Sequence, residues 1–316
     1  MWLSPMADRV AWLPYASPEE ARRRIGGIPD GVEVHCYRAD GDAYPESIDR
    51  VEFYVLPYLK GEEVLERASE MAQLKVIQTL TAGYENFQPH VPDGVTLCNA
   101  AGVHDASTAE LALALVLASG RHLGLYARNQ SEGRWAAQAG TALADQRVLI
   151  IGYGHIGEAI ERRLAGFEVA SITRVARRAR DGAVVVHPIT DLHDLLPTTD
   201  VAIVIAPLTA ETAGMINAEA LALLPDDALL VNVARGKLVD TEALVAETSV
   251  GRLRAALDVT DPEPLPADHR LWRLPNVIIS PHVGGASSAF FPRADRLIAA
   301  QLARFAAGEV LENIIP

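Results

Sequence analysis

The chain has 316 residues, of which 49% are hydrophobic, and it carries a formal net charge of -13 at pH 7. This length exceeds what one hydrophobic core usually serves, so two domains are expected. The acidic excess disfavours nucleic acid as a partner, because a phosphate backbone is bound mainly by Lys and Arg.

The first hundred residues alternate short apolar runs with helical patterns. We expect strands at residues 10–13, 32–37, 51–56, 74–78 and 95–97, and helices at 18–25 and 61–72. This alternation predicts a small domain with a parallel sheet. Cys36 and Cys98 fall in strand-like stretches and are too few for a disulfide framework or a metal cluster, so we expect unreactive, packed thiols and no metal site.

A domain boundary is expected near residues 100–105. Ser107 and Glu110 have the spacing of a capping box, and residues 111–118 then run apolar on every side, which predicts a helix buried between domains or at a subunit contact. This longest apolar run is well short of the roughly 18 residues of a membrane helix. The first residues also lack the pattern of a secretory signal, so we expect a cytoplasmic protein.

From residue 147 a second α/β series begins. We expect six strands, at residues 148–151, 169–173, 201–205, 229–232, 255–257 and 277–280, and then a long helix at 288–307 closed by Gly308. Without a further strand after Pro281, the tail is expected to return to the first domain. The predicted fold class is α/β, with two Rossmann-like or flavodoxin-like parallel-sheet domains and a cleft between them. Residues 102–285 are expected to form a domain inserted in one made by 1–101 and 286–316.

The strand at 148–151 leads into a turn that matches the dinucleotide-binding pattern G-x-G-x-x-G: Gly152, Tyr153, Gly154, His155, Ile156 and Gly157. Gly152 permits the tight turn, Gly154 lets the backbone approach a pyrophosphate, and Gly157 lets the helix pack on the strand. The N–H groups at the start of the helix face the anion. We therefore predict that the inserted domain binds a dinucleotide, with a ligand-free tight turn as the alternative.

The end of the next strand discriminates between NAD and NADP. Enzymes that prefer NAD usually carry Asp or Glu about 20 residues after the turn. Here Thr173 and Arg174 hold that place, and Arg177, Arg178 and Arg180 follow. A guanidinium can pair with a 2'-phosphate, so we expect NADP. NAD is the alternative if these arginines only form a solvated surface.

Three residues that can bind anions or exchange protons follow later strands of this series: Arg235, Glu263 and His282. Parallel strands end at the edge where ligands bind, so the three side chains are expected to converge. Arg235 would bind a carboxylate and a carbonyl oxygen, while Glu263 and His282 would form a pair that exchanges a proton with that oxygen. A structural ion pair and a packed histidine are the alternatives. Asp258 would accept from a nicotinamide carboxamide or cap a helix.

Together these residues resemble the D-isomer-specific 2-hydroxyacid dehydrogenases over almost the whole chain. The matching stretches are Thr81-Ala82-Gly83-Tyr84, Thr108-Ala109-Glu110-Leu111, the glycine turn, Pro207-Leu208-Thr209 with Thr212, Asn232-Val233-Ala234-Arg235-Gly236, Leu257-Asp258-Val259 with Glu263-Pro264, and Pro281-His282-Val283-Gly284. The resemblance implies that Arg235, Glu263 and His282 are catalytic. It also implies that Ala82, Gly83 and Tyr84 bind the substrate carboxylate together with Arg235, and that the cofactor site includes Pro207, Thr212, Val233, Ala234 and Asp258. A homodimer is implied as well, with Trp135 in the region that usually reaches across the interface. A packed surface aromatic is the alternative for this residue.

The sequence thus predicts an NADP-preferring reductase of a small 2-oxo acid, with glyoxylate or hydroxypyruvate as candidate substrate. Two alternatives stay open: an NAD-dependent phosphoglycerate-type dehydrogenase, and a dinucleotide-sensing, corepressor-like protein without catalysis. The expected partners are the small acid and a second copy of the chain, with neither nucleic acid nor a membrane.

Overall fold

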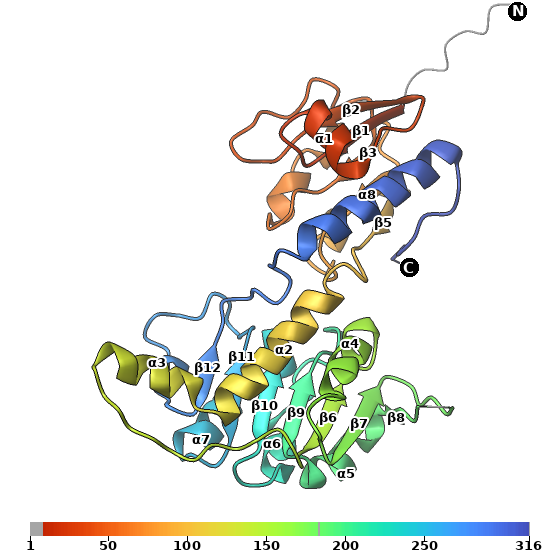
Figure 1. Cartoon of the computed structure of the whole chain (residues 1–316). Coiled ribbons are helices and arrows are strands. Elements are labelled where there is room, and N and C mark those ends of the chain that lie inside the picture. Colours follow the sequence, from red (N-terminus) through yellow and green to blue (C-terminus); the bar gives the residue numbers. More distant parts are fainter. Residues whose placement is uncertain (1–8, 183, 316) are drawn as a thin grey trace, which may run out of the picture. The chain divides into compact units, whose positions relative to one another are not determined.

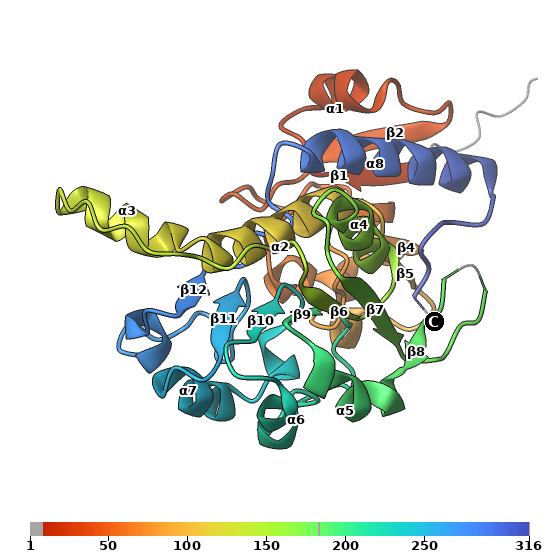
Figure 2. The ribbon, with the colours of Figure 1, turned by 60° about the horizontal axis from the view of Figure 1, so that its bottom comes forward.

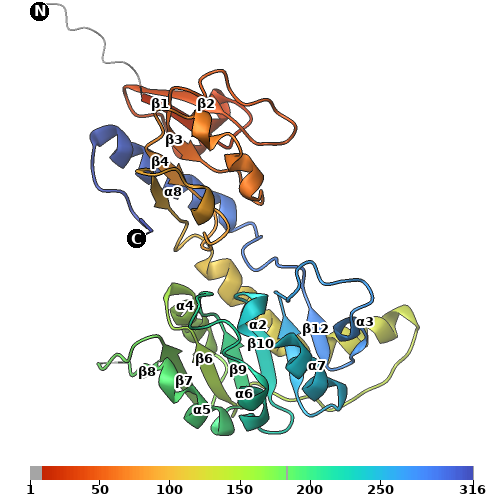
Figure 3. The ribbon, with the colours of Figure 1, turned by 180° about the vertical axis from the view of Figure 1, so that it is seen from behind.

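The computed structural model describes residues 9–182 and 184–315, and the chain folds into two compact units. Unit 1 comprises Met1–His104 and Ser288–Pro316, and unit 2 comprises Asp105–Ser287, so unit 2 is inserted in the chain of unit 1. The sequence placed these boundaries at 101/102 and 285/286. Each unit is built on a fully parallel sheet with helices (Figures 1 and 3), which confirms the predicted α/β fold class.

The sheet of unit 1 has five strands in the order β2-β1-β3-β4-β5. They are β1 (Arg9–Leu13), β2 (Val32–Cys36), β3 (Val51–Val55), β4 (Val76–Gln78) and β5 (Thr96–Cys98). Helices α1 (Pro18–Ile25) and α8 (Phe290–Ala307) bury apolar side chains against one face, and Figure 2 shows them beside the sheet. Their ends follow the sequence signals, because the Ser17 side chain caps α1 and Gly308 ends α8 at φ 71°.

The prediction of one helix at residues 61–72 is wrong. The chain forms two short 3-10 helices there, η1 (Glu62–Leu65) and η2 (Ala68–Glu70), because the backbone at Arg67 leaves the helical region with φ -103° and ψ 18°. Val64, Leu65 and Ala68 still pack on the second face of the sheet. Burial of these few side chains therefore does not require a continuous α-helix. A third 3-10 helix, η3 (Gln88–His90), precedes β5.

The sheet of unit 2 has seven strands in the order β12-β11-β10-β9-β6-β7-β8, which can be followed from left to right in Figure 2. They are β6 (Arg147–Ile151), β7 (Ser171–Ala176), β8 (His187–Pro188), β9 (Val201–Val204), β10 (Leu229–Asn232), β11 (Arg254–Leu257) and β12 (Val277–Ile279). The expected count of six missed β8, because a strand of two residues leaves no periodic pattern.

Helices cover both faces of this sheet. One face carries α2 (Asp105–Gly120) and α4 (His155–Leu164), and the other carries α5 (Leu192–Leu195), α6 (Ala218–Leu223) and α7 (Thr241–Ser249). Short 3-10 helices lie in the connections: η4 (Ile189–Asp191), η5 (Leu196–Thr198), η6 (Gly236–Leu238) and η7 (Arg270–Arg273). Helix α3 (Leu123–Ser131), which the sequence did not predict, projects from the body of unit 2 (Figure 2).

The prediction of a capping box formed by Ser107 and Glu110 is also wrong. Helix α2 begins at Asp105, so Ser107 lies inside its first turn, and the Ser107 hydroxyl lies 2.6 Å from that of Ser287. The serine connects α2 to the last residue of unit 2 and does not cap the helix. None of the helices in the described ranges is long and apolar enough to cross a membrane.

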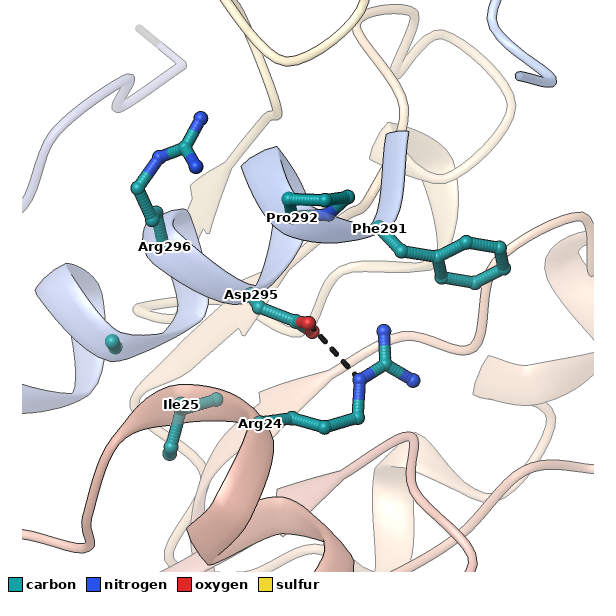
Figure 4. Close-up of a pocket in the computed structure, with 7 residues that line it drawn as sticks. Arg24, Ile25, Phe291, Pro292, Asp295 and Arg296 are labelled. Atoms are coloured by element: carbon teal, nitrogen blue, oxygen red, sulfur yellow. Dashed lines mark hydrogen bonds and ion pairs between the residues drawn. The ribbon is translucent and has the colours of Figure 1, made fainter. Parts of the chain in front are cut away.

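A surface hollow in unit 1 lies between the end of α1 and the first turns of α8 (Figure 4). Its arginine is already engaged, because Arg24 Nε donates to Asp295 Oδ2 over 3.0 Å. The guanidinium also lies over the rings of Tyr15 and Phe291, at 5.0 and 5.1 Å. This cluster holds the two helices together, and we assign it a structural role.

Candidate active site

The glycine turn lies between β6 and α4, as the pattern requires. A Cβ at Gly152, which has φ 109°, would lie 2.4 Å from Ala206 N, and one at Gly157 would lie 2.5 Å from Gly152 O. Neither position tolerates a side chain. At Gly154, by contrast, a Cβ would meet nothing within 4 Å, so this part of the backbone is open to a ligand. The shape therefore fits the pyrophosphate of a dinucleotide at the start of α4.

The strand that follows the turn ends later than the sequence suggested. Strand β7 runs from Ser171 to Ala176, and its register pairs Leu149 with Thr173 and Ile151 with Val175. Thr173 and Arg174 are thus strand residues, and the positions level with Gly152 are those that follow Val175. The prediction that Thr173 and Arg174 stand at the strand end is wrong. The strand was expected at residues 169–173, and it ends three residues later, at Ala176.

Arg174 is also bound within the protein. Its Nε donates to Glu161 Oε2 over 2.6 Å and its Nη2 donates to Glu161 Oε1, which makes a two-point ion pair with helix α4. The guanidinium holds the pKa of the Glu161 carboxyl below its usual range. Tyr153 of the glycine turn donates from its hydroxyl to the same carboxylate over 2.5 Å, and both Arg174 and Arg180 lie over its ring. This cluster fixes the turn.

Arg177 and Arg178 differ from Arg174 both in their position relative to the end of β7 and in their lack of a partner among the described residues. They are exposed, and they directly follow the end of β7. Among the residues that the structure describes, neither makes an ion pair or hydrogen bond. They are therefore the available cations at the level of the glycine turn, a role that the sequence gave first to Arg174.

The loops that carry the three predicted catalytic residues follow neighbouring strands. β10 pairs with β11 and β11 with β12, and the registers bring Asn232 level with Leu257 and Leu257 level with Ile279. The loops after these strands therefore start at the same edge of the sheet. The first two are in direct contact, since a Cβ at Gly236 would lie 1.9 Å from Thr260 O.

His282 and Glu263 form the predicted pair. His282 Nδ1 lies 2.5 Å from Glu263 Oε1, and the side chains are 47% and 41% exposed, so solvent or a ligand reaches both. With Nδ1 engaged by the carboxylate, Nε2 is the ring atom left to face a reacting group. His282 has φ 52°, an uncommon backbone conformation for a residue with a side chain. A carboxylate that holds one ring nitrogen supports an imidazole that exchanges a proton through the other.

Arg235 follows β10 directly and is half-buried. Its Nη1 donates to the Ala234 carbonyl over 2.7 Å, and it has further interactions within the protein. The loop is shaped by Asn232, whose side chain accepts from Ala234 N over 3.1 Å and donates to Arg235 O over 2.9 Å. The sequence analysis missed Asn232, although an amide that ends the apolar run of β10 was a usable signal. Val233 and Ala234 are almost fully buried.

Asp258 has a different arrangement from the one expected. It is 2% exposed, and its carboxylate accepts from Ser280 Oγ at 2.6 Å, Val283 N at 2.9 Å and Gly284 N at 2.8 Å. All three donors belong to the loop of His282. The structure therefore uses this carboxylate to bind the loop of His282 and not as a helix cap. The expected contact to a nicotinamide carboxamide stays a prediction, since a carboxylate has about four lone-pair sites and the loop occupies three. Ser280 is a second residue that the sequence analysis did not single out.

The remaining predicted contacts lie in two loops. In unit 2, Thr212 Oγ1 donates to Pro207 O over 2.7 Å and closes the loop after β9. In unit 1, Ala82 and Gly83 follow β4 with their carbonyls occupied, by Asn99 Nδ2 at 2.7 Å and Thr81 Oγ1 at 2.6 Å. Within the described part of the chain their N–H groups have no acceptor. Two such adjacent donors suit a carboxylate.

Comparison with known proteins connects this geometry to a family. Residues 113–284 match the model of the D-isomer specific 2-hydroxyacid dehydrogenase NAD binding domain. The chain is 34% identical over 270 residues to a glyoxylate reductase of Pyrococcus horikoshii, covering 80% of this chain and 79% of that protein.

Two solved structures have similar folds. One, a D-isomer specific 2-hydroxyacid dehydrogenase of Xanthobacter autotrophicus Py2 in complex with NADPH and MES, has a TM-score of 0.80 at 27% identity and covers 98% of both chains. The other, an NADPH-dependent glyoxylate/hydroxypyruvate reductase of Sinorhizobium meliloti in complex with NADP and malonate, has a TM-score of 0.78 at 27% identity, over 98% of this chain and 97% of that one. The chain therefore belongs to the D-isomer-specific 2-hydroxyacid dehydrogenase family, and it is an NAD(P)-dependent oxidoreductase that acts on 2-hydroxy acids and the corresponding 2-oxo acids.

Proposed function

We propose that this protein reduces a small 2-oxo acid, with glyoxylate or hydroxypyruvate as the first candidates, and that NADPH is its preferred reductant. The observation that carries the proposal is the Glu263–His282 pair at 2.5 Å on the strand edge that also carries Arg235. The names of the relatives support the substrate class, because one is a glyoxylate reductase and another a glyoxylate/hydroxypyruvate reductase.

The bound nicotinamide would supply the hydride, and the protein would supply the proton and the electrostatics. His282 would donate a proton from Nε2 to the carbonyl oxygen while Glu263 holds Nδ1 and stabilises the charged ring. A positioned acid of this kind typically contributes about a hundred- to ten-thousand-fold in rate. Arg235 would bind the substrate carboxylate through its planar fork and stabilise charge on the carbonyl oxygen.

In unit 1, we propose that the backbone at Ala82 and Gly83 binds the substrate carboxylate. The N–H groups of Ala82 and Gly83 have no acceptor within the described residues, while the side chains of Thr81 and Asn99 donate to the carbonyls of Gly83 and Ala82. Tyr84, which donates from its backbone N–H to Glu85, is the third residue of this proposed carboxylate-binding segment. Two adjacent backbone donors suit a small carboxylate.

The preference for NADPH rests on Arg177 and Arg178. No Asp or Glu stands between Thr173 and Arg180 to repel a 2'-phosphate, and these two exposed guanidinium groups directly follow β7. Arg174 would act indirectly, by fixing the glycine turn through Glu161. The two NADPH- or NADP-containing relatives support this assignment. NAD stays the second candidate cofactor.

We also propose a homodimer that works in the cytoplasm. Trp135 is 99% exposed, and residues 131–140 beside α3 are all exposed. Helix α3 and this segment project from unit 2 in Figure 2. An indole this exposed would bury a large apolar area by packing against a second copy of the chain.

Initial rates test the activity. A panel of 2-oxo acids, including glyoxylate, hydroxypyruvate and phosphohydroxypyruvate, should be measured with NADPH and with NADH. We expect the highest kcat/KM for glyoxylate or hydroxypyruvate with NADPH. A preference for phosphohydroxypyruvate and NADH would favour the phosphoglycerate-type alternative, and tight dinucleotide binding without turnover would favour the corepressor-like one.

A further inference from the structure

We propose that Asp258 is a positioning residue, which holds the His282 loop in its working conformation through a clamp of hydrogen bonds. This inference rests on the proposed function, because it assigns a role relative to His282 as the proton donor. It differs from an assignment of Asp258 to the cofactor, in which the carboxylate would accept from the nicotinamide carboxamide.

The clamp consists of hydrogen bonds between Asp258 and loop residues that precede and follow His282. On the near side, the Ser280 hydroxyl donates to Asp258 Oδ1 over 2.6 Å. On the far side, Val283 N donates to Oδ1 over 2.9 Å and Gly284 N donates to Oδ2 over 2.8 Å. The backbone carbonyl of Asp258 accepts from His282 N itself over 2.8 Å. Asp258 thus accepts four hydrogen bonds, from Ser280, His282, Val283 and Gly284.

His282 needs such support. At φ 52° its backbone is in the left-handed region, which a residue with a side chain adopts at a cost in free energy. Uncommon conformations of this kind persist where surrounding contacts determine them. The four hydrogen bonds to Asp258 supply those contacts, and the backbone conformation in turn sets the direction in which the imidazole leaves the chain.

The clamp is buried and is connected to the central sheet of unit 2. Asp258 N donates to Asn232 O over 2.9 Å, which anchors the residue to the end of β10. A Cβ at Gly284 would lie 2.9 Å from Asp258 Oδ2, so the loop approaches the carboxylate as closely as only glycine permits. A buried carboxylate that accepts three hydrogen bonds is well satisfied.

The first test compares kcat with cofactor affinity in Asp258→Asn. The amide keeps the size of the side chain but points an N–H group at loop donors, so the loop loses at least one contact. We expect kcat with glyoxylate to fall about 10- to 100-fold, because a small misplacement of a catalytic group is enough for such a loss. The Kd for NADPH, measured by fluorescence titration, should stay within about threefold of wild type. An unchanged kcat with a Kd raised more than tenfold would overturn the inference.

A second variant guards against misfolding of Asp258→Asn. Ser280→Ala removes only the near-side donor, and we expect about a three- to tenfold loss of kcat without a change in NADPH affinity. Ser280→Thr keeps the hydroxyl and should recover most of the lost rate. Equal kcat in wild type and Ser280→Ala would contradict the clamp.

A double-mutant cycle separates positioning from an independent role. If Asp258 acts through His282, Asp258→Asn should cause no further loss of kcat in a His282→Gln background. A second, equal loss would show that Asp258 acts on its own and would overturn the inference. If His282→Gln itself keeps wild-type turnover, the proposed function fails instead, so the two failures are distinguishable.

Asp200 provides a matched control. Its carboxylate also accepts three hydrogen bonds, all from Arg147, at 2.8, 2.9 and 2.6 Å, and it precedes β9 at the opposite end of the strands. Asp200→Asn should lower the melting temperature and leave kcat and the NADPH Kd unchanged. A loss of kcat in this control similar to that in Asp258→Asn would assign both losses to general destabilisation and would overturn the specific role.

Discussion

His282 Nδ1 lies 2.5 Å from Glu263 Oε1, although the two residues are separated by 19 positions in the chain. Strand β12 lies between them in sequence, and its pairing with β11 brings their loops to one edge of the sheet. The pair leaves Nε2 of the imidazole for the substrate. Its two members therefore have separate tasks, and each can be tested.

Glu263→Gln should lower kcat for 2-oxo acid reduction by about a hundredfold, because the amide keeps the hydrogen bond to Nδ1 but no longer stabilises the charged imidazole. Steady-state rates with NADPH would measure the loss. Glu247→Gln is the matched control, since Glu247 also pairs with a basic side chain at 2.5 Å, that of Arg252. A Glu263 variant within twofold of wild type would exclude the assigned role.

Replacement of Arg235 by Lys should raise KM for the 2-oxo acid and lower kcat/KM by at least about a hundredfold. Lysine keeps the charge but loses the planar fork that binds a carboxylate at two points. Arg235→Ala should lose still more. The control is Arg254→Lys, which changes an arginine bound to Asp227 at the opposite end of β11. Near-normal turnover of glyoxylate by Arg235→Ala would rule out substrate binding by this residue.

The double variant Arg177→Ala/Arg178→Ala should weaken NADPH about 10- to 100-fold and leave NADH nearly unchanged, since each lost charge-assisted contact to a phosphate contributes about 1.5–3 kcal/mol at most. Arg174→Ala should affect the two cofactors equally, because Arg174 supports the turn through Glu161. Titration of each variant with both reduced cofactors gives the comparison. A selective loss of NADPH in Arg174→Ala alone would return the 2'-phosphate contact to that residue.

Trp135→Glu should shift the protein from dimer to monomer. The indole is 99% exposed in the single chain, and a charged side chain in its place would have to be desolvated at an interface. Sedimentation velocity over a range of concentrations would show the change. Trp272→Glu, at a second exposed indole (48% exposed), is the control. A wild-type chain that sediments as a monomer would contradict the proposed dimer.

The thiol of Cys98 should be unreactive in the folded protein. Burial raises its pKa from 9.0 to about 11, and burial has the same effect on Cys36. Because the thiolate is the nucleophile, only about one thiol in a thousand is reactive at pH 8. Iodoacetamide at pH 8 should therefore label the folded protein far more slowly than the protein in urea, as mass spectrometry can measure. Rapid labelling of Cys98 in the folded protein would contradict this burial.

The sequence by itself predicted those features that local pattern controls. The apolar runs placed both parallel sheets, since buried strands need continuous apolar residues. The glycine turn was recognised from its G-x-G-x-x-G spacing after an apolar strand, and the structure gives the reason for two of the glycines, because a Cβ at Gly152 or Gly157 would overlap the backbone. Arg235, Glu263 and His282 stood out because each is a polar residue that follows a buried strand, and parallel strands end at a common edge.

Tertiary structure decided which atoms meet. Three residues of extra length in β7 moved the strand end past Arg174, and only the register with β6 reveals this. The pairing of Arg174 with Glu161 and the loop donors around Asp258 depend on side chains brought together from distant parts of the chain. Sequence spacing carries no information on such contacts, because their geometry is set by strand order and packing. A charged residue can therefore be recognised from sequence as important, while the partner that it binds is determined only by the fold.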